Sequence, residues 1–304
     1  MSDSQHHSNT AQGHREPGFL VDTAWLAAHR GRPDLRLFDC SATMQVDPVI
    51  QQRVHPERDA FEAAHLPGAR FIDIEADLSD RSHQVHLMLP PRDAFAQAMS
   101  RLGVSNDSLV VIYSTSNIWW ATRVWWMLRV YGFDNAHILD GGLARWRAEG
   151  RALEAGPSAL AAPGRFVAAP ARSLVAGRDD VLRAIGAPHT RIVNALRPTQ
   201  YSGEEAPRKG RRGHIESSIN VPAGSLLDAA TGCLLDDAAL QAVFESAGIE
   251  HSQRVIAYCG GGVSASLDVF ALTKLGYKDV LLYDASLGEW GSDDSLPMRE
   301  ERTI

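Results

Sequence analysis

Residues 254–266 read Arg-Val-Ile-Ala-Tyr-Cys-Gly-Gly-Gly-Val-Ser-Ala-Ser, and this stretch carries the strongest structural signal in the chain. The apolar run that ends at Tyr258 predicts a short buried strand, and residues 267–275 have the apolar spacing of a helix. A cysteine and three glycines lie between them. A strand, a glycine-rich loop and a helix in this order indicate an α/β fold, in which the carboxyl ends of the strands hold the ligand.

The loop that begins at Cys259 suits a reactive thiol. Glycines allow the backbone to curl so that several N–H groups point at the sulfur. The following helix adds partial positive charge at its N-terminus, which favours the thiolate form of the cysteine. A buried structural cysteine beside a glycine turn is the alternative interpretation of the same motif.

The same pattern of segments occurs twice in the chain. Tyr113 and Tyr258 end similar apolar runs 145 residues apart, and Trp146 and Trp290 follow similar turns 144 residues apart. His65 and His214 begin a third matched segment, with an offset of 149, and residues 36–39 match 191–194 with an offset of 155. Matched segments in one order indicate two copies of a single domain.

We therefore predict two tandem α/β domains, each a mainly parallel sheet flanked by helices. The N-terminal domain is expected over 18–150 and the C-terminal domain over 171–304. The Ala/Pro/Gly-rich stretch 151–170 is expected to be a linker, and the polar residues 1–17 a disordered tail. Helices are predicted at Asp93–Leu102 and Asp236–Ala247.

The two copies differ where chemistry is expected. Ser114 stands in the first copy where the second has Cys259, and the loop after Ser114 contains no glycine. A purely structural cysteine gives no reason for this difference, so we predict that only the second copy is active. His65 and His214 occupy the same motif in both copies, which favours a structural role in bonding a turn.

Composition and charge exclude several other classes of function. A formal net charge of -7 over 304 residues argues against a nucleic-acid partner, because phosphate binding needs a basic face. No apolar run reaches the ~20 residues that span a bilayer, since the run 118–130 is short and contains two arginines. The N-terminus lacks the apolar core of a secretory signal, and we expect a cytoplasmic protein. The run 118–130 also contains four tryptophans, which are expected in the first domain's core and the interdomain contact: Trp119, Trp120, Trp125 and Trp126.

Three cysteines without a CxxC spacing fit free thiols in a reducing compartment and predict no structural metal site. Cys40 and Cys233 have no glycine loop, so neither is expected to take part in the reaction. Cysteine phosphatases also use a strand, loop and helix, but they need an arginine six residues after the cysteine. Ala265 occupies that place, which sets the phosphatase interpretation aside.

With these features the chain resembles the two-domain rhodanese and 3-mercaptopyruvate sulfurtransferase family from about Phe19 to Pro297. The segments that carry the resemblance are 61–69, 71–74, 89–90, 123–126, 139–142, 213–215, 220–222 and 259–264. The resemblance implies an inactive N-terminal rhodanese domain and a catalytic C-terminal one. It also implies that backbone N–H groups of the loop hold a persulfide on Cys259, the loop residues being Gly260, Gly261, Gly262, Val263 and Ser264.

The chemistry implied by the resemblance is sulfur transfer in two steps. The thiolate takes the outer sulfur of a small anionic donor, thiosulfate or a mercapto acid, and cyanide or a thiol then accepts it. No metal or organic cofactor is required. Two alternatives stay open: a sulfurtransferase that prefers 3-mercaptopyruvate, and a non-catalytic sulfur-binding or regulatory module.

The loop departs from both family subtypes at its first two positions. Thiosulfate-type members carry basic residues where this chain has Gly260 and Gly261, and mercaptopyruvate-type members have a serine at the second of these positions. We therefore expect measurable activity with thiosulfate but a high KM for it. Arg197 matches the family arginine that binds the donor's anionic group, with Arg212 as a second candidate. The basic segment 208–212 is either a solvated loop or a means of steering anionic donors to the site.

Overall fold

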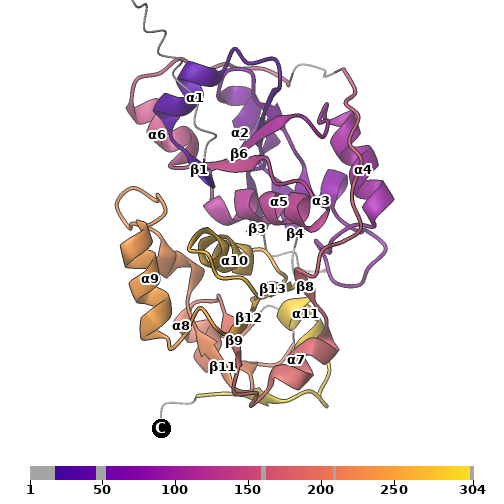
Figure 1. The fold of residues 1–304 in the computed structure, drawn as a ribbon, viewed down its shortest axis with the longest axis vertical. Helices are drawn as coiled ribbons and strands as arrows, with labels where there is room; N and C mark the ends of the chain where they lie inside the picture. Colours follow the sequence, from indigo (N-terminus) through magenta and orange to yellow (C-terminus); the bar gives the residue numbers. More distant parts are fainter. Residues whose placement is uncertain (1–17, 46–52, 159–161, 208–209, 302–304) are drawn as a thin grey trace, which may run out of the picture.

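The computed structural model describes residues 18–45, 53–158, 162–207 and 210–301. The predicted tail 1–17, together with Arg208 and Lys209, lies outside these residues. Figure 1 shows two lobes that follow one another along the chain, the first in indigo to magenta and the second in orange to yellow.

The first lobe contains a five-stranded parallel sheet with the strand order β1-β7-β6-β2-β5. Its strands are β1 (Leu20–Val21), β2 (Leu35–Asp39), β5 (Arg70–Phe71), β6 (Leu109–Tyr113) and β7 (Ala136–Leu139). A separate antiparallel pair is formed by β3 (Ala42–Gln45) and β4 (Arg53–Pro56). The helices of this lobe are α1 (Thr23–His29), α2 (Arg58–Ala63), α3 (Ile74–Leu78), α4 (Arg92–Arg101), α5 (Ile118–Val130) and α6 (Gly142–Ala148).

The second lobe contains another five-stranded parallel sheet, with the order β11-β9-β12-β13-β8. Its strands are β8 (Val175–Ala176), β9 (Thr190–Asn194), β11 (Ser218–Asn220), β12 (Arg254–Tyr258) and β13 (Val280–Tyr283). An antiparallel pair is formed by β10 (His214–Ile215) and β14 (Met298–Arg299). The helices are α7 (Arg178–Ala184), α8 (Pro198–Ser202), the 3-10 turn η1 (Ala223–Leu226), α9 (Asp237–Ser246), α10 (Ala265–Lys274) and α11 (Ser286–Trp290).

The two sheets have the same topology. Read from the matching edge, β5-β2-β6-β7-β1 in the first sheet corresponds strand for strand to β11-β9-β12-β13-β8 in the second. The central strands β6 and β12 end at Tyr113 and Tyr258, the pair that the sequence repeat aligned. The predicted fold class, two parallel α/β domains flanked by helices, is therefore confirmed.

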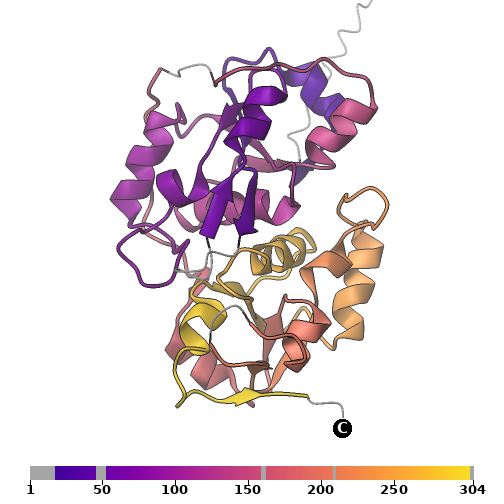
Figure 2. The ribbon, with the colours of Figure 1, turned by 180° about the vertical axis from the view of Figure 1, so that it is seen from behind.

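The core is shared between the domains. Each sheet has an outer apolar cluster of its own, whereas one central cluster contains residues of both sheets and of α5 and α10. Figures 1 and 2 show these two helices side by side between the sheets. The rings of Trp125 and Phe270 meet edge to face at 4.8 Å, and Thr122 and Ser266 share a hydrogen bond of 2.8 Å. The predicted place of the tryptophans in the first domain's core and at this contact is thus confirmed for Trp120, Trp125 and Trp126, which are buried.

The predicted helices are present, with boundaries that differ by one residue. α4 begins one residue before the predicted Asp93, because Pro91 stands at its N-cap and leaves Arg92 as the first helical residue. α9 begins one residue after the predicted start, because the Asp236 side chain caps it by accepting from Ala239 N at 2.8 Å. These one-residue differences at the helix ends do not change where the candidate site residues lie.

Candidate active site

Cys259 lies directly after β12, the central strand of the second sheet, and only 2% of its surface is exposed. Strands β9 and β13 flank β12 on both sides, so the cysteine is held at the middle of the sheet's carboxyl edge. The chain then turns through 260–264 into α10, with Gly262 in the left-handed region at φ +72°. The sequence predicted this strand, loop and helix in the right order, and α10 begins two residues before the predicted start at Leu267.

One buried hydroxyl fixes the shape of the loop. Ser286 Oγ accepts the N–H groups of Cys259 at 3.0 Å and Gly262 at 3.2 Å, and it donates to the carbonyl of Tyr283 at 2.8 Å. Within the described part of the chain, the remaining loop N–H groups donate to no protein acceptor, and these belong to Gly260, Gly261, Val263 and Ser264. The loop therefore offers unused backbone donors beside the sulfur.

The loop carbonyls are turned toward α11. Leu287 N donates to the carbonyl of Cys259 at 3.1 Å, and Gly288 N donates to that of Gly260 at 2.8 Å. Because a peptide unit points its C=O and N–H in opposite directions, carbonyls bound on one side leave the N–H groups for the other. Such an array of donors next to a helix N-terminus stabilises negative charge on a nearby sulfur.

A side chain of the first domain reaches into the second and supports the loop from behind. Arg123 on α5 is fully buried; it donates to the carbonyl of Gly262 at 3.3 Å, pairs with the carboxylate of Asp284 and donates to the carbonyl of Leu87. The same carboxylate accepts Leu89 N at 2.8 Å. The first domain therefore takes part in shaping the loop that follows Cys259.

The sequence reasoning did not identify Arg123, Asp284 or Ser286 as parts of the site. Arg123 is one of the two arginines in the apolar run 118–130, and a buried arginine in such a run needs a carboxylate partner. Asp284 occupies in the second copy the place that Asp140 has in the first, 144 residues earlier, and this match by itself indicates no role. Ser286 gave no signal of its own beyond standing where the first copy has Gly142.

Arg197 lies three residues after the end of β9, whose last residue pairs with Tyr258, and Arg212 lies further along the same segment, just before β10. Arg197 precedes α8 with two thirds of its side chain exposed, and it pairs with Glu205 at 2.6 Å. Arg212 is exposed and donates to the carbonyls of Gly203 and Glu204 at 3.1 and 3.0 Å. Both guanidinium groups are thus held by groups of their own segment.

The described part of the basic segment packs on the end of α11. Arg211 donates to the carbonyls of Trp290 at 3.2 Å and Asp293 at 2.6 Å, and its backbone N–H donates to the carbonyl of Gly291 at 2.9 Å. These contacts give Arg211 a structural role in holding the segment to the second domain. Arg208 and Lys209 lie outside the described residues.

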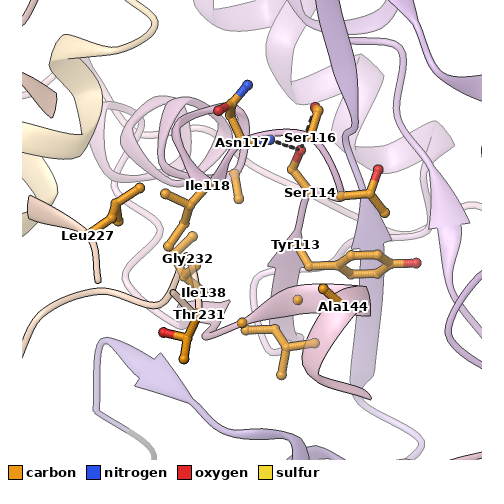
Figure 3. Close-up of a pocket in the computed structure, with 15 residues that line it drawn as sticks. Tyr113, Ser114, Ser116, Asn117, Ile118, Ile138, Ala144, Leu227, Thr231 and Gly232 are labelled. Carbon is orange, nitrogen blue, oxygen red and sulfur yellow. Dashed lines mark hydrogen bonds between the residues drawn. The ribbon is translucent and has the colours of Figure 1, made fainter. Parts of the chain in front are cut away.

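The matching place in the first domain contains a cavity of about 180 Å³ that lacks a thiol (Figure 3). Ser114, the counterpart of Cys259, lies 3.3 Å from the hydroxyl of Ser116 and 3.4 Å from the N–H of Asn117, so its oxygen is engaged locally. Leu227, Thr231 and Gly232 of the second domain line the same cavity. The loop after β6 therefore has a serine at the place where the loop after β12 has the thiol of Cys259.

The two matched histidines have equivalent contacts. His65 Nδ1 lies 2.8 Å from the carbonyl of Phe61 with the rings stacked, and His214 Nδ1 lies 2.9 Å from the carbonyl of Tyr201 with the same stacking. Both rings are buried. These contacts agree with the structural role expected from their positions in both copies.

The other two thiols differ from Cys259 in their surroundings. All three cysteines are free. Cys40 directly follows β2 and is fully buried, and burial raises the pKa of its thiol well above the ordinary value. Cys233 lies on a turn of the second domain against Gly141 and Arg145 of the first.

No group of three or more His, Cys, Asp or Glu side chains among the described residues is placed to hold a metal ion. No helix among the same residues is long and apolar enough to cross a membrane.

Known proteins with similar sequences contain rhodanese-like domains or are named sulfurtransferases. The model of the rhodanese-like domain matches the chain twice, over residues 22–149 and 178–293. A 3-mercaptopyruvate sulfurtransferase of Escherichia coli is 36% identical over 284 residues, covering 92% of this chain and 97% of that protein. A putative thiosulfate sulfurtransferase, SseB of Mycobacterium tuberculosis, is 38% identical over 243 residues, which cover 79% of this chain and 84% of that protein.

A solved structure is also similar to this chain. The crystal structure of SseA from Escherichia coli, a 3-mercaptopyruvate sulfotransferase with the rhodanese fold, superposes with a TM-score of 0.77. Its sequence identity to this chain is 34%, and the match covers 89% of this chain and 99% of that one.

Proposed function

The chain belongs to the rhodanese family and is a sulfurtransferase, and we propose that Cys259 carries the transferred sulfur as a persulfide. The observation that supports this most is the loop itself. It combines a thiol at the end of a central strand with N–H groups that have no protein acceptor in the described structure. The N–H groups proposed to hold the persulfide are those of Gly260, Gly261, Val263 and Ser264, while that of Gly262 is used by Ser286.

The reaction balances without a cofactor. The Cys259 thiolate attacks the outer sulfur of the donor, a new S–S bond forms, and the bond between that sulfur and the rest of the donor breaks. Thiosulfate then leaves sulfite. A mercapto acid such as 3-mercaptopyruvate leaves pyruvate. The methyl carbon of pyruvate receives the proton that the donor's thiol has lost. Cyanide or a thiol attacks the outer sulfur of the persulfide and restores the thiolate.

We propose that 3-mercaptopyruvate is a better donor than thiosulfate. Gly260 and Gly261 place no charged side chain at the loop, and a dianion loses more from missing cations than a monocarboxylate does. Arg197, assisted by Arg212, is proposed to bind the donor's carboxylate. Steady-state rates with the two donors side by side, with cyanide as acceptor, test this proposal. A KM for thiosulfate in the low micromolar range would place the anion site on other residues.

We further propose the division of the chain into an N-terminal domain over 18–150 without activity, a linker over 151–170, and a catalytic domain over 171–304. The first sheet lies within 20–139 and the second within 175–283, which supports these limits. Free thiols favour a reducing compartment, so we propose that the protein is cytoplasmic.

The test of the nucleophile is direct. After treatment with a sulfur donor, mass spectrometry is expected to find one added sulfur on the peptide that contains Cys259. Cys259→Ser should abolish both the added sulfur and the transfer, because a serine hydroxyl is not ionised at neutral pH and cannot hold a persulfide.

Cys40→Ser and Cys233→Ser are the matched controls and should keep most of the activity. Loss of activity in either folded control would mean that Cys259 does not act alone. A protein that binds sulfur but transfers none to cyanide or a thiol would instead be a sulfur-binding module.

A further inference from the structure

One segment of the first domain reaches the loop that follows Cys259. Residues 79–91 connect α3 to α4, and Figures 1 and 2 show this segment, in purple, beside the yellow α11 of the second domain. A Cβ at Gly288 of α11 would lie 2.8 Å from Val85 Cγ1 and 3.3 Å from the carbonyl oxygen of Gly260. Val85 and the first glycine of the loop therefore lie next to the same residue of α11.

The segment around Val85 is held in one position by contacts across the domain boundary. The carbonyl of Leu87 accepts from Arg123, and Leu89 N donates to Asp284 at 2.8 Å. Leu87 has φ +66°, a conformation that a residue with a Cβ keeps only where its surroundings impose it. The arginine and the carboxylate of these contacts also support the active-site loop, so the segment and the loop are positioned together.

Open space lies between Val85 and the two glycines that follow the cysteine. A Cβ at Gly260 or Gly261 would meet no atom within 4 Å, so the valine side chain does not fill this space. Gly260 is exposed, and Gly261 and Val85 are partly exposed, whereas only 2% of the surface of Cys259 is accessible. The open side of the loop is therefore at the two glycines, and Val85 borders it.

Val85 and Arg197 lie on opposite sides of Cys259. β9 and β13 flank the strand that ends before the cysteine, on its two sides. Arg197 follows β9, and α11, on which Val85 packs, follows β13. A donor that binds Arg197 through its anionic group therefore has its remaining substituents on the side of Val85.

We propose that Val85 is a specificity-determining residue of the sulfurtransferase, an apolar side chain that limits the width of the group bonded to the donor's outer sulfur. The proposal deepens the proposed function and rests on Cys259 as the nucleophile. Donors with a narrow substituent reach the sulfur, whereas an aromatic substituent meets the valine methyl groups. Val85 makes and breaks no bond in the reaction.

Methanethiosulfonate and benzenethiosulfonate are the probes, because both are monoanions with the same reacting sulfur and differ in the width of one substituent. In each case the thiolate attacks the outer sulfur, an S–S bond forms, the bond to the sulfonyl sulfur breaks, and a sulfinate leaves. The quantity measured is the ratio of kcat/KM for benzenethiosulfonate to kcat/KM for methanethiosulfonate, with cyanide as acceptor. Comparing this ratio between variants cancels the difference in intrinsic reactivity of the two donors.

Val85→Ala should raise this ratio roughly tenfold, because a lost contact of a few methyl groups changes discrimination by about that factor or more. Val85→Phe should lower the ratio by a similar factor. A change in folding or in general activity lowers both rates together and leaves the ratio where it was. Val167→Ala is the matched control, because this valine is 63% exposed and its backbone bonds Asn106 of the first domain. It should leave the ratio unchanged.

A ratio that stays within about twofold of the wild type in either folded variant overturns the proposal. A ratio that moves in the same direction in both variants overturns it as well. These results leave the proposed function intact. A wild type that takes up no sulfur on Cys259 from any donor contradicts the proposed function, and the role of Val85 is then wrong with it.

Discussion

Ser286 adopts a backbone conformation that ordinarily favours glycine. Its φ is +50°, and the matching residue of the first domain is Gly142 with φ +48°. A side chain in this conformation costs about 1–2 kcal/mol. The serine hydroxyl offsets this cost by accepting the N–H groups of Cys259 and Gly262, which would otherwise be buried without a partner. At this residue the requirement of the loop outweighs the local backbone preference.

Ser286→Ala is expected to lower the free energy of unfolding by about 1–3 kcal/mol, because two buried N–H groups lose their acceptor. We expect kcat/KM for a sulfur donor to fall roughly tenfold. Ser286→Gly relieves the backbone cost and should be more stable than the alanine variant, with equally low activity. Urea unfolding and steady-state kinetics measure both quantities. An alanine variant with wild-type kcat/KM would show that the hydroxyl does not hold the loop in its working shape.

Arg197 and Glu205 give a second prediction at the scale of single residues. Their ion pair is exposed, with 67% and 40% of the two side chains accessible, and such pairs contribute little to stability. A donor anion can therefore replace Glu205 as the partner of Arg197. Arg197→Ala should raise KM for either donor roughly tenfold to hundredfold, since a charged hydrogen bond contributes about 1.5–3 kcal/mol. Glu205→Gln should lower KM.

Arg183→Ala is the matched control, because it breaks an exposed Arg–Asp pair on α7 that is remote from the proposed anion site. It should leave KM unchanged. Unchanged KM in Arg197→Ala would remove this arginine from the donor site.

At the scale of elements, the turn between β12 and α10 depends on one glycine far more than on its neighbours. Gly262 has φ +72°, and a Cβ there would lie 2.7 Å from the carbonyl oxygen of Asp284. A Cβ at Gly260 or Gly261 would meet no atom within 4 Å, and neither residue has a positive φ. The first two glycines therefore leave space beside the sulfur, whereas the third is required by the backbone.

Gly262→Ala should therefore impair sulfur transfer by roughly tenfold or more and lower stability by more than about 1 kcal/mol. Gly261→Ala, at an open position of the same loop, should change either quantity little. Gly261→Lys should lower KM for thiosulfate, because it returns a cation to a loop that has the room for it. Kinetics with both donors on the three variants test this, and equal damage from both alanines would refute the assignment of Gly262.

At the scale of the whole molecule, the first domain contributes to the proposed active site, although Ser114 and not a cysteine follows its own central strand β6. α5 and α10 pack together in an apolar cluster that spans both domains. Within that contact, Arg123 joins the Gly262 carbonyl to Asp284 and to the Leu87 carbonyl of the first domain. The position of one domain on the other therefore affects the shape of the loop.

Arg123→Met is expected to lower the free energy of unfolding by about 3–5 kcal/mol, because it leaves Asp284 buried without its cation. Adding Asp284→Asn should recover part of this loss, which a double-mutant cycle by urea unfolding measures. Arg172→Met breaks an exposed pair with Asp134 and should cost about 1 kcal/mol or less. Additive effects of Arg123→Met and Asp284→Asn would contradict a direct coupling.

Much of this molecule could be predicted from local patterns. Short apolar runs predicted strands that end at Tyr113 and Tyr258, where β6 and β12 end in the structure, and helical spacing predicted α4 and α9 to within one residue. The internal repeat predicted two domains of equal topology, because similar segments in the same order fold in the same way. The loop after Cys259 was visible because glycine next to a strand end is a strong local signal.

The partners of the loop were decided by the tertiary structure alone. Arg123 lies 139 residues before Gly262 and Ser286 lies 27 residues after Cys259, so no spacing in the sequence brings them together. Asp268 on α10 is buried without a hydrogen-bond partner in the described structure, which likewise follows from the packing of α10 between both domains. The periodicity of apolar residues shows which side of a helix or strand is buried. Contacts between distant segments depend instead on how the sheets and helices assemble. That assembly decides whether a buried charged group has a partner.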